Sequence, residues 1–269
     1  MRPRLFLHVV GLEARKRLSY RFDFWIQALV SFAAELGIAW FLWQAIFNES
    51  GKTVIGGRTL DDMVLYYVAV ILVAKLARGN LFAVAVASEI YDGGLNRYLV
   101  YPVPYLGFKL AQSLGTLLPA AIQLFAFGAL FPFMVQGTLA HPTPGSVVMG
   151  LVSILVAHVL YFVMQVCLEG VAFWADNVWS LNVALRLVSG LLGGIMIPLA
   201  AFPDAWQPVL AALPFRHVFS DPVEALLGQR TVLAWAADLG IALAWTAAFS
   251  LVARWVFRRG SYAYTGVGI

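Results

Sequence analysis

The sequence predicts an all-α integral membrane protein whose chain crosses the bilayer six times. Hydrophobic residues make up 61% of the 269 residues and charged residues only 12%, a balance far from that of soluble domains. From Phe22 to Phe257 the chain is a succession of apolar stretches separated by short polar breaks. A helix needs about twenty apolar residues to cross roughly 30 Å of hydrocarbon, and six stretches meet this need.

The expected spans set the topology. In chain order they are Phe22–Phe47, Met63–Ala87, Leu106–Val135, Val147–Leu168, Leu181–Leu199 and Leu233–Phe257. Outside the spans and near their ends, Lys and Arg gather on the side of the N-terminus, at 2–21, 97, 109, 254, 258 and 259. Because cytoplasmic loops retain positive charge, we expect both termini in the cytoplasm. The net charge of +4 then reflects topology, and we expect no nucleic-acid partner.

Residues 3–18 precede the first span. Leu5, Val9 and Leu12 follow helical spacing, and the cations Arg15 and Arg17 follow them. This pattern predicts an amphipathic helix in the membrane interface with its cations toward anionic lipid headgroups; a soluble extension is the alternative. No cleavable signal peptide is expected, because this segment is charged and lacks a continuous apolar core. We expect residues 1–269 to form a single transmembrane domain.

The second span is expected to begin at a capping box, in which Thr59 is followed three residues later by Asp62. The polar segment 88–105 that follows this span is the longest loop expected on the cytoplasmic side. Within it, Gly93 and Gly94 break the helix, and the residues after them can form about two helical turns. In the third span, the ring of a proline at 119 predicts a kink.

Residues 201–230, between the fifth and sixth spans, are semi-apolar and interrupted by Pro203, Pro208, Pro214 and Pro222. Both ends of this stretch must face the outer side if the sixth span returns to the cytoplasm. The pattern predicts a short helical hairpin that dips into the outer leaflet, packed on protein so that its backbone groups find partners.

Three charges fall in the interior of the first two expected spans. Glu35 lies near the middle of the first span, Lys75 near the middle of the second, and Arg78 one turn beyond Lys75. A lone charge at mid-bilayer costs about 2.5–3.5 kcal/mol on insertion scales, so we expect Glu35 to pair with Lys75, Arg78 or both. Two roles stay open: a static pin between helices, or a translocation path that contacts a polar or anionic headgroup.

The remaining polar residues predict no catalytic site and no metal site. The four histidines are scattered over different depths, and Cys167 is the only cysteine. His158 stands alone in the fourth span and is expected to be a satisfied packing residue. Gly190 and Gly194 have the spacing that lets helices approach closely, either at a dimer seam or in an internal contact.

Three motifs resemble those of a known family. They are Tyr66-Tyr67 with the later loop from Gly94 to Pro102, the stretch from Phe202 through Trp206 to Phe215 followed by Pro222 and Leu227-Gly228, and the terminal segment from Tyr262 to Gly268. Over essentially its whole length the chain resembles the permeases of ABC-2 type transporters, the membrane half of ATP-driven exporters in the bacterial cytoplasmic membrane.

This resemblance implies partners and sites. Such permeases work as dimers, with an identical or a sister permease, and two ATPase subunits dock beneath them and bind ATP and Mg. The interfacial helix and the loop 88–105 form the docking surface. The candidate docking residues are Leu95, Arg97, Tyr98, Leu99 and Tyr101, and the alternative for them is an interfacial turn. The candidate outer-gate residues are Phe202, Pro203, Trp206, Pro214 and Phe215.

The chain has no Gly-x-x-x-x-Gly-Lys-Ser/Thr loop for a triphosphate, so ATP hydrolysis is expected from a partner chain and no cofactor is expected on this one. An apolar path with sparse charge favours an amphiphilic or lipid-like substrate moved by alternating access. The alternative is a secondary transporter or membrane scaffold subunit without ATP coupling.

Overall fold

The computed structural model describes residues 1–19, 21–79, 86–134 and 142–264, and their regular elements are helical. The longer helices are α1 (Pro3–Ser19), α2 (Arg21–Ser50), α3 (Leu60–Arg78), α6 (Tyr105–Met134), α7 (Pro144–Glu169), α8 (Trp179–Leu192) and α12 (Val232–Ala263). The short ones are α4 (Val86–Tyr91), α5 (Leu95–Leu99), α9 (Gln207–Ala212), α10 (Pro214–Val218) and α11 (Ser220–Leu226).

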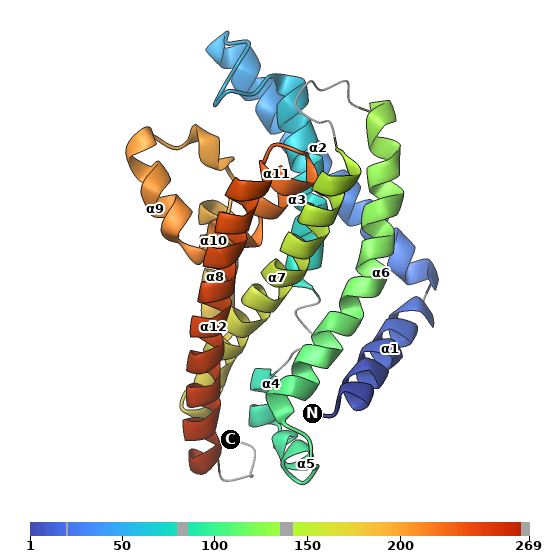
Figure 1. The fold of residues 1–269 in the computed structure, drawn as a ribbon, viewed down its shortest axis with the longest axis vertical. Helices are drawn as coiled ribbons and strands as arrows, with labels where there is room; N and C mark the ends of the chain where they lie inside the picture. Colours follow the sequence, from blue (N-terminus) through green and yellow to red (C-terminus); the bar gives the residue numbers. More distant parts are fainter. Residues whose placement is uncertain (20, 80–85, 135–141, 265–269) are drawn as a thin grey trace.

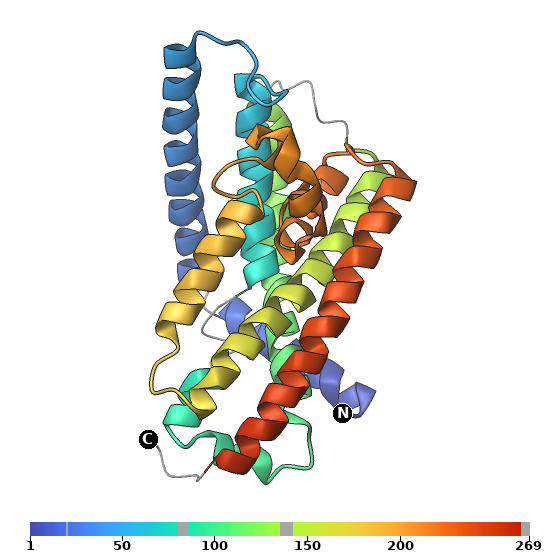
Figure 2. The same ribbon diagram turned by 90° about the vertical axis from the view of Figure 1, so that its left-hand side faces the viewer.

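The long helices run along the long axis of the molecule, as Figure 1 shows. The start of α1 and the end of α12 lie at the same end as α4 and α5, while α9 and the connection between α2 and α3 lie at the opposite end (Figures 1 and 2). A chain that crosses a membrane an even number of times must have both of its ends on the same side, and this arrangement agrees with that requirement.

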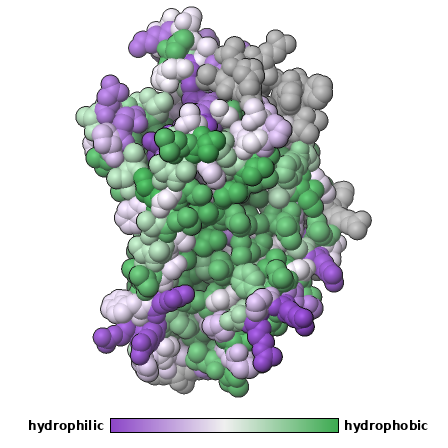
Figure 3. Space-filling model, viewed as in Figure 1, coloured by the Kyte–Doolittle hydropathy of each residue, from purple (hydrophilic) through white to green (hydrophobic). Residues whose placement is uncertain are grey.

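The surface supports a membrane location. Figure 3 shows a broad band of hydrophobic residues across the middle of one face, with hydrophilic residues gathered above and below it. In the described part of the chain, four helices are long and apolar enough to cross a membrane: Trp25–Ser50, Tyr105–Gly128, Pro144–Phe173 and Val232–Ala263. They correspond to the first, third, fourth and sixth expected spans. The chain is a multi-pass, all-helical membrane protein.

The second expected span is not one continuous helix, which corrects the prediction of Met63–Ala87. The capping box at Thr59 is confirmed, but α3 ends at Arg78, and Gly79 follows with a φ of 58°. A left-handed backbone at this point cannot continue a right-handed helix. Residues 80–85 lie outside the described part, and the chain resumes as α4 at Val86.

Side chains of α7 cap both sides of this break. His158 Nδ1 lies 2.9 Å from the carbonyl oxygen of Leu76 near the end of α3, and its Nε2 lies 2.8 Å from Ser113 Oγ of α6. Because a carbonyl only accepts, Nδ1 donates and Nε2 accepts the serine hydroxyl. The Glu169 carboxylate accepts the backbone N–H of Val86 at 2.7 Å, at the start of α4. His158 is thus a satisfied interior residue, as predicted.

The fifth expected span is also shorter than predicted. It was expected to reach Leu199, but α8 ends at Leu192 and the chain turns at Gly193 and Gly194. The Tyr66 hydroxyl donates to the Gly194 carbonyl and the Tyr67 hydroxyl to that of Met196, both at 2.8 Å. The glycine spacing at the end of α8 therefore serves an internal contact.

The count of six crossings consequently stays a prediction. The helix α3 carries charges at both ends, and α8 is an apolar helix of only 14 residues, so neither meets the length and composition criteria that the other four spans meet. The helices α10 and α11 pack against α3, α7, α8 and α12. Their predicted dip into the membrane likewise stays a prediction.

The first helix, α1, covers the lower part of α6 (Figure 1). Its buried residues Val9, Glu13 and Ala14 face the bundle, while Leu7 and Leu12 are exposed. The backbone of α1 reaches Gly115 of α6 so closely that a Cβ there would meet Val10 and Glu13. The helix predicted over residues 3–18 is thus fixed to the bundle by one face and leaves apolar residues free on another.

Replacing Gly194 with alanine should destabilise the protein. Gly194 has a φ of 89°, and an added Cβ would meet Ser220 Oγ and the Tyr66 hydroxyl. The left-handed backbone and the overlap together should cost about 2 kcal/mol or more. We expect a lower thermal unfolding temperature for Gly194→Ala. Gly240→Ala is the matched control, because a Cβ on Gly240 meets nothing within 4 Å and alanine favours the helix; an equal loss in both variants would contradict the argument.

Candidate functional site

The loop between α4 and α6 is built on an inward-facing anchor. Leu95 of α5 is fully buried, and three residues later the Tyr98 ring packs against Tyr105 and Phe108 of α6, with ring centroids 5.3 and 5.6 Å away. Residues three apart lie on one face of a helix. That face of α5 is therefore directed into the protein.

A buried ion pair holds the same loop from beneath. Lys109 Nζ of α6 lies 2.6 Å from the carboxylate of Glu89 on α4, and only 3% of the lysine side chain is exposed. The Tyr105 hydroxyl donates to the same carboxylate, and the Tyr98 ring covers the ammonium group at 5.3 Å. Breaking one side of a buried pair usually costs about 3–5 kcal/mol, so this contact fixes α4 to α6. Lys109 therefore has a structural role in addition to being one of the positive charges used to orient the chain.

The opposite face of α5 is open. Leu99, Val100 and Tyr101 are exposed by 49, 83 and 62%, and Arg97 is exposed beside them. This corrects the predicted docking set: Arg97, Leu99 and Tyr101 point outward, whereas Leu95 and Tyr98 hold the loop in place. We call residues 97 and 99–101 the α5 patch. An exposed apolar and aromatic cluster with one cation at its edge is typical of a protein contact.

The intramembrane charges are arranged differently from the expectation. Lys75 Nζ donates to Ser31 Oγ of α2 at 2.7 Å and lies 3.5 Å from the Ala28 carbonyl oxygen. Glu35 is exposed one turn further along α2, and within the described residues no ion pair of 4.0 Å or less joins it to Lys75 or Arg78. Glu35 still lies close enough to both cations to attract them. The direct pair is not formed, because polar groups of α2 nearer to Lys75 take its ammonium group.

Arg78 lies among α3, α8 and the buried segment α10–α11. Its guanidinium carbon stands 5.0 Å above the Phe219 ring, and Nη2 reaches the Arg186 carbonyl oxygen at 3.5 Å. Its Nε is buried without a hydrogen-bond partner among the residues described. The exposed Arg186 side chain is close enough to repel it. Lys75 and Arg78 therefore share one carboxylate, that of Glu35, and Arg186 adds a further cation beside Arg78, so positive charge is in surplus here.

The candidate outer-gate residues fall into two groups. Pro203 and Trp206 are exposed and Phe202 is half-buried, in the turn before α9. Pro214 is buried and Phe215 half-buried at the start of α10. The Gln207 side-chain amide stabilises this turn by donating hydrogen bonds to the carbonyl oxygens of Leu199 and Phe202. The five residues thus lie in one stretch of the chain but differ in exposure.

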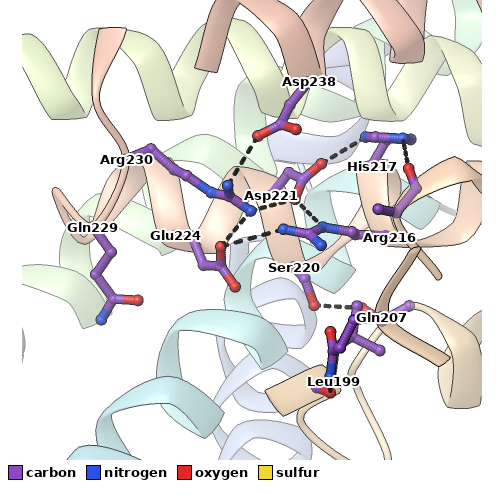
Figure 4. A network of polar contacts seen from close by, with 12 residues as sticks. Leu199, Gln207, Arg216, His217, Ser220, Asp221, Glu224, Gln229, Arg230 and Asp238 are labelled. Carbon is purple, nitrogen blue, oxygen red and sulfur yellow. Dashed lines mark hydrogen bonds and ion pairs between the residues drawn. The ribbon is translucent and has the colours of Figure 1, made fainter. Parts of the chain in front are cut away.

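The sequence reasoning missed a charge network beneath this segment, which Figure 4 shows. At its centre Asp221 accepts hydrogen bonds from His217 Nδ1 at 2.6 Å, Arg216 Nε at 2.7 Å and Arg230 Nη2 at 3.3 Å. Arg230 also lies 2.8 Å from Glu224 and 3.4 Å from Asp238 of α12. The network ties α10, α11 and α12 together. Charges at 216, 217, 221 and 224 within a semi-apolar stretch were the available signal.

The chemistry of the network is that of an internal clamp. Burial opposes ionisation of Asp221, but the hydrogen bonds from His217 and Arg216 outweigh it and hold the pKa of this carboxyl below its usual value. His217, Asp221 and Asp238 have ligand atoms within 4.8 Å of one another. A cation there would have to displace the arginines that Asp221 already binds, so the donor set fits ion pairing better than metal coordination.

Replacing Asp221 with asparagine should strongly destabilise the segment 199–231. The change leaves Arg216, Arg230 and His217 with a weaker shared acceptor, and removing one partner of a buried ion-pair network costs about 3–5 kcal/mol. We expect a lower unfolding temperature and faster proteolysis within the segment. Asp204→Asn removes the same charge from an exposed position and should change neither measurement; equal effects of both variants would contradict the clamp.

Comparison with known proteins identifies the family. The family model described as ABC-2 family transporter protein matches residues 33–268, which include the α5 patch, the intramembrane cations and the charge network. A search of curated proteins finds no match. Because the family model covers nearly the whole chain, the protein belongs to the ABC-2 family transporter proteins, the membrane components that associate with ABC ATPases.

Proposed function

We propose that this chain is the permease subunit of an ATP-driven exporter and that the α5 patch receives the ATPase. The observation that carries the proposal is the pairing of an exposed cluster, Leu99 to Tyr101, with a rigid support from Leu95, Tyr98 and the pair of Glu89 and Lys109. A contact that transmits force needs such a support, because a mobile loop would absorb the motion of its partner.

The α5 patch would face the cytoplasm together with both termini. Two ATPase subunits, carrying ATP and Mg, would dock beneath a dimer of this permease with itself or with a sister chain. Closure of the ATPases would move α4 and α5, and the buried contact of Glu89 with Lys109 would pass that motion to α6. Alternating access follows if nucleotide binding favours one of two arrangements of the spans.

The substrate would be an amphiphile with an anionic group. Lys75, Arg78 and Arg186 supply more positive charge than Glu35 balances, and unpaired charge within a membrane is costly. A phosphate or carboxylate on a lipid-like substrate would satisfy these cations during passage. The exit would lie along the segment 198–228, where Phe202, Trp206 and Phe215 would form the outer gate.

The docking role predicts loss of the ATPase from a double variant. Leu99→Ala with Tyr101→Ala removes two exposed anchors, each of which typically contributes about 2 kcal/mol at a small interface, so the ATPase should bind on the order of several hundredfold more weakly. Co-purification and ATPase titration on the inserted permease measure this. Trp206→Ala with Val209→Ala removes a similar exposed pair at the opposite end of the molecule and should retain the ATPase.

Normal co-purification of the Leu99 and Tyr101 double variant would contradict docking at the α5 patch. If the native complex contained no nucleotide hydrolase at all, the chain would instead be assigned as a secondary transporter or a scaffold subunit. Tyr98 is not a suitable probe, because its ring packs inward on Tyr105 and Phe108.

The substrate path predicts a loss of transport without a loss of assembly. Lys75→Met removes one cation while keeping the length and most of the volume of the side chain, and a charged hydrogen bond contributes about 1.5–3 kcal/mol. Export should fall about tenfold to a hundredfold while the ATPase stays bound. Lys52→Met, in the exposed connection before α3, is the control. Unchanged export by Lys75→Met would assign Lys75 to helix packing alone.

A further inference from the structure

An apolar groove lies near the end of the bundle that carries both chain termini. It has a volume of about 640 Å³ and opens between α6 and α12, with α7 as its floor and α1 at one edge. In Figure 1, α6 and α12 lie on either side of α7, and Figure 3 shows hydrophobic residues over the same face. A volume of this size lies within the usual range of about 300–1,000 Å³ for sites that take small molecules.

The body of this groove, the α6–α12 groove, is lined by side chains that suit a hydrocarbon chain. Phe162 and Val166 of α7 form the floor, Leu106 and Leu110 of α6 form one wall, and Phe257 of α12 forms part of the other. Phe162 and Val166 are buried by the bundle, so the floor is preformed and does not depend on a ligand to assemble it. The groove is therefore a ready site for a chain of methylene groups.

The mouth of the groove carries two cations. Arg254 and Arg258 lie one turn apart on α12, and both line the groove. Both are exposed, and among the described residues neither has a carboxylate within ion-pair distance. By contrast, Lys109, Arg216 and Arg230 all have acidic partners. Two free guanidinium groups side by side favour a phosphate, which they can bind with several charge-assisted hydrogen bonds.

The depth of these arginines matches that of a lipid headgroup. Arg254 lies roughly 33 Å along α12 from Val232 at the usual rise per residue, and α12 is inclined to the long axis of the molecule (Figure 2). The hydrocarbon core is about 30 Å thick. Arg254 and Arg258 therefore reach the interface at the end that carries both chain termini, while the groove extends from them toward the hydrocarbon.

We propose that the α6–α12 groove binds one anionic glycerophospholipid, with its phosphate between Arg254 and Arg258 and an acyl chain along Phe162 and Val166. Charge complementarity at the mouth and apolar lining in the body meet at the depth where a phospholipid changes from headgroup to chain. The site requires only that the chain lies in a membrane, and it does not depend on ATP coupling or on the exported substrate.

Lipid counting on the purified permease tests this site. The protein is stripped with detergent and titrated with phosphatidylglycerol or phosphatidylcholine of identical acyl chains, and native mass spectrometry counts the bound lipids. We expect one phosphatidylglycerol to bind about tenfold more tightly than phosphatidylcholine. Arg254→Gln should abolish this preference, because it removes a charge-assisted contact. Arg259→Gln removes the same charge from α12 outside the groove and should leave the preference intact.

A second variant tests the body of the groove. Gly107 lines it, and a Cβ there meets only Pro104 Cγ at 3.6 Å, an ordinary contact, so Gly107→Leu should fold and fill the space. We expect it to lose the bound lipid of either headgroup. Equal binding of the two lipids by the unchanged protein would overturn the proposal, as would equal effects of Arg254→Gln and Arg259→Gln. If the variants changed the oligomeric state and left lipid binding unaltered, the groove would be an interface between copies.

Discussion

The structure depends on one constraint: backbone groups released where a helix stops inside an apolar bundle must find partners without water. Two segments stop in this way, at the end of α3 and at the end of α8. His158 takes a carbonyl at the end of α3, and Glu169 takes the N–H groups at the start of α4. Tyr66 and Tyr67 take the carbonyls released after α8. These four polar side chains allow the chain to break and still remain packed.

Because the capping side chains come from α3 and α7, these two helices fix the positions of the neighbouring short helices. The side chains of α7 place α4, and the tyrosines of α3 place the turn that leads to α9, α10 and α11. Glu169 begins the chain of contacts at one end, and Glu89 with Lys109 continues it to α6 and the α5 patch. At the other end Ser220 joins the Gly193 carbonyl and the Tyr66 hydroxyl. Contacts thus run without interruption from the patch to the charge network.

The features that could be predicted from the sequence are those that depend on neighbouring residues. Length and hydropathy predicted the four long spans, and the capping box at Thr59 was confirmed because it involves neighbours only. The break at Gly79 was missed, since a single glycine in an apolar run becomes a helix end only when distant His158 caps it. A helix of five residues carries too little periodicity to show that Tyr98 faces inward. The charge network depended on Arg230 and Asp238, which only the tertiary fold brings to Asp221.

The distribution of paired and unpaired cations supports the same physical account. Three cations enclosed by protein, Lys109, Arg216 and Arg230, each have an acidic residue beside them, because a buried lone charge is strongly unfavourable. The cations near Glu35 and at the mouth of the α6–α12 groove have no such partner at ion-pair distance among the described residues. An anionic amphiphile could supply the missing charge at both places. Under the two proposals, one molecular class would satisfy both sites, as transported substrate in the first and as resident lipid in the second.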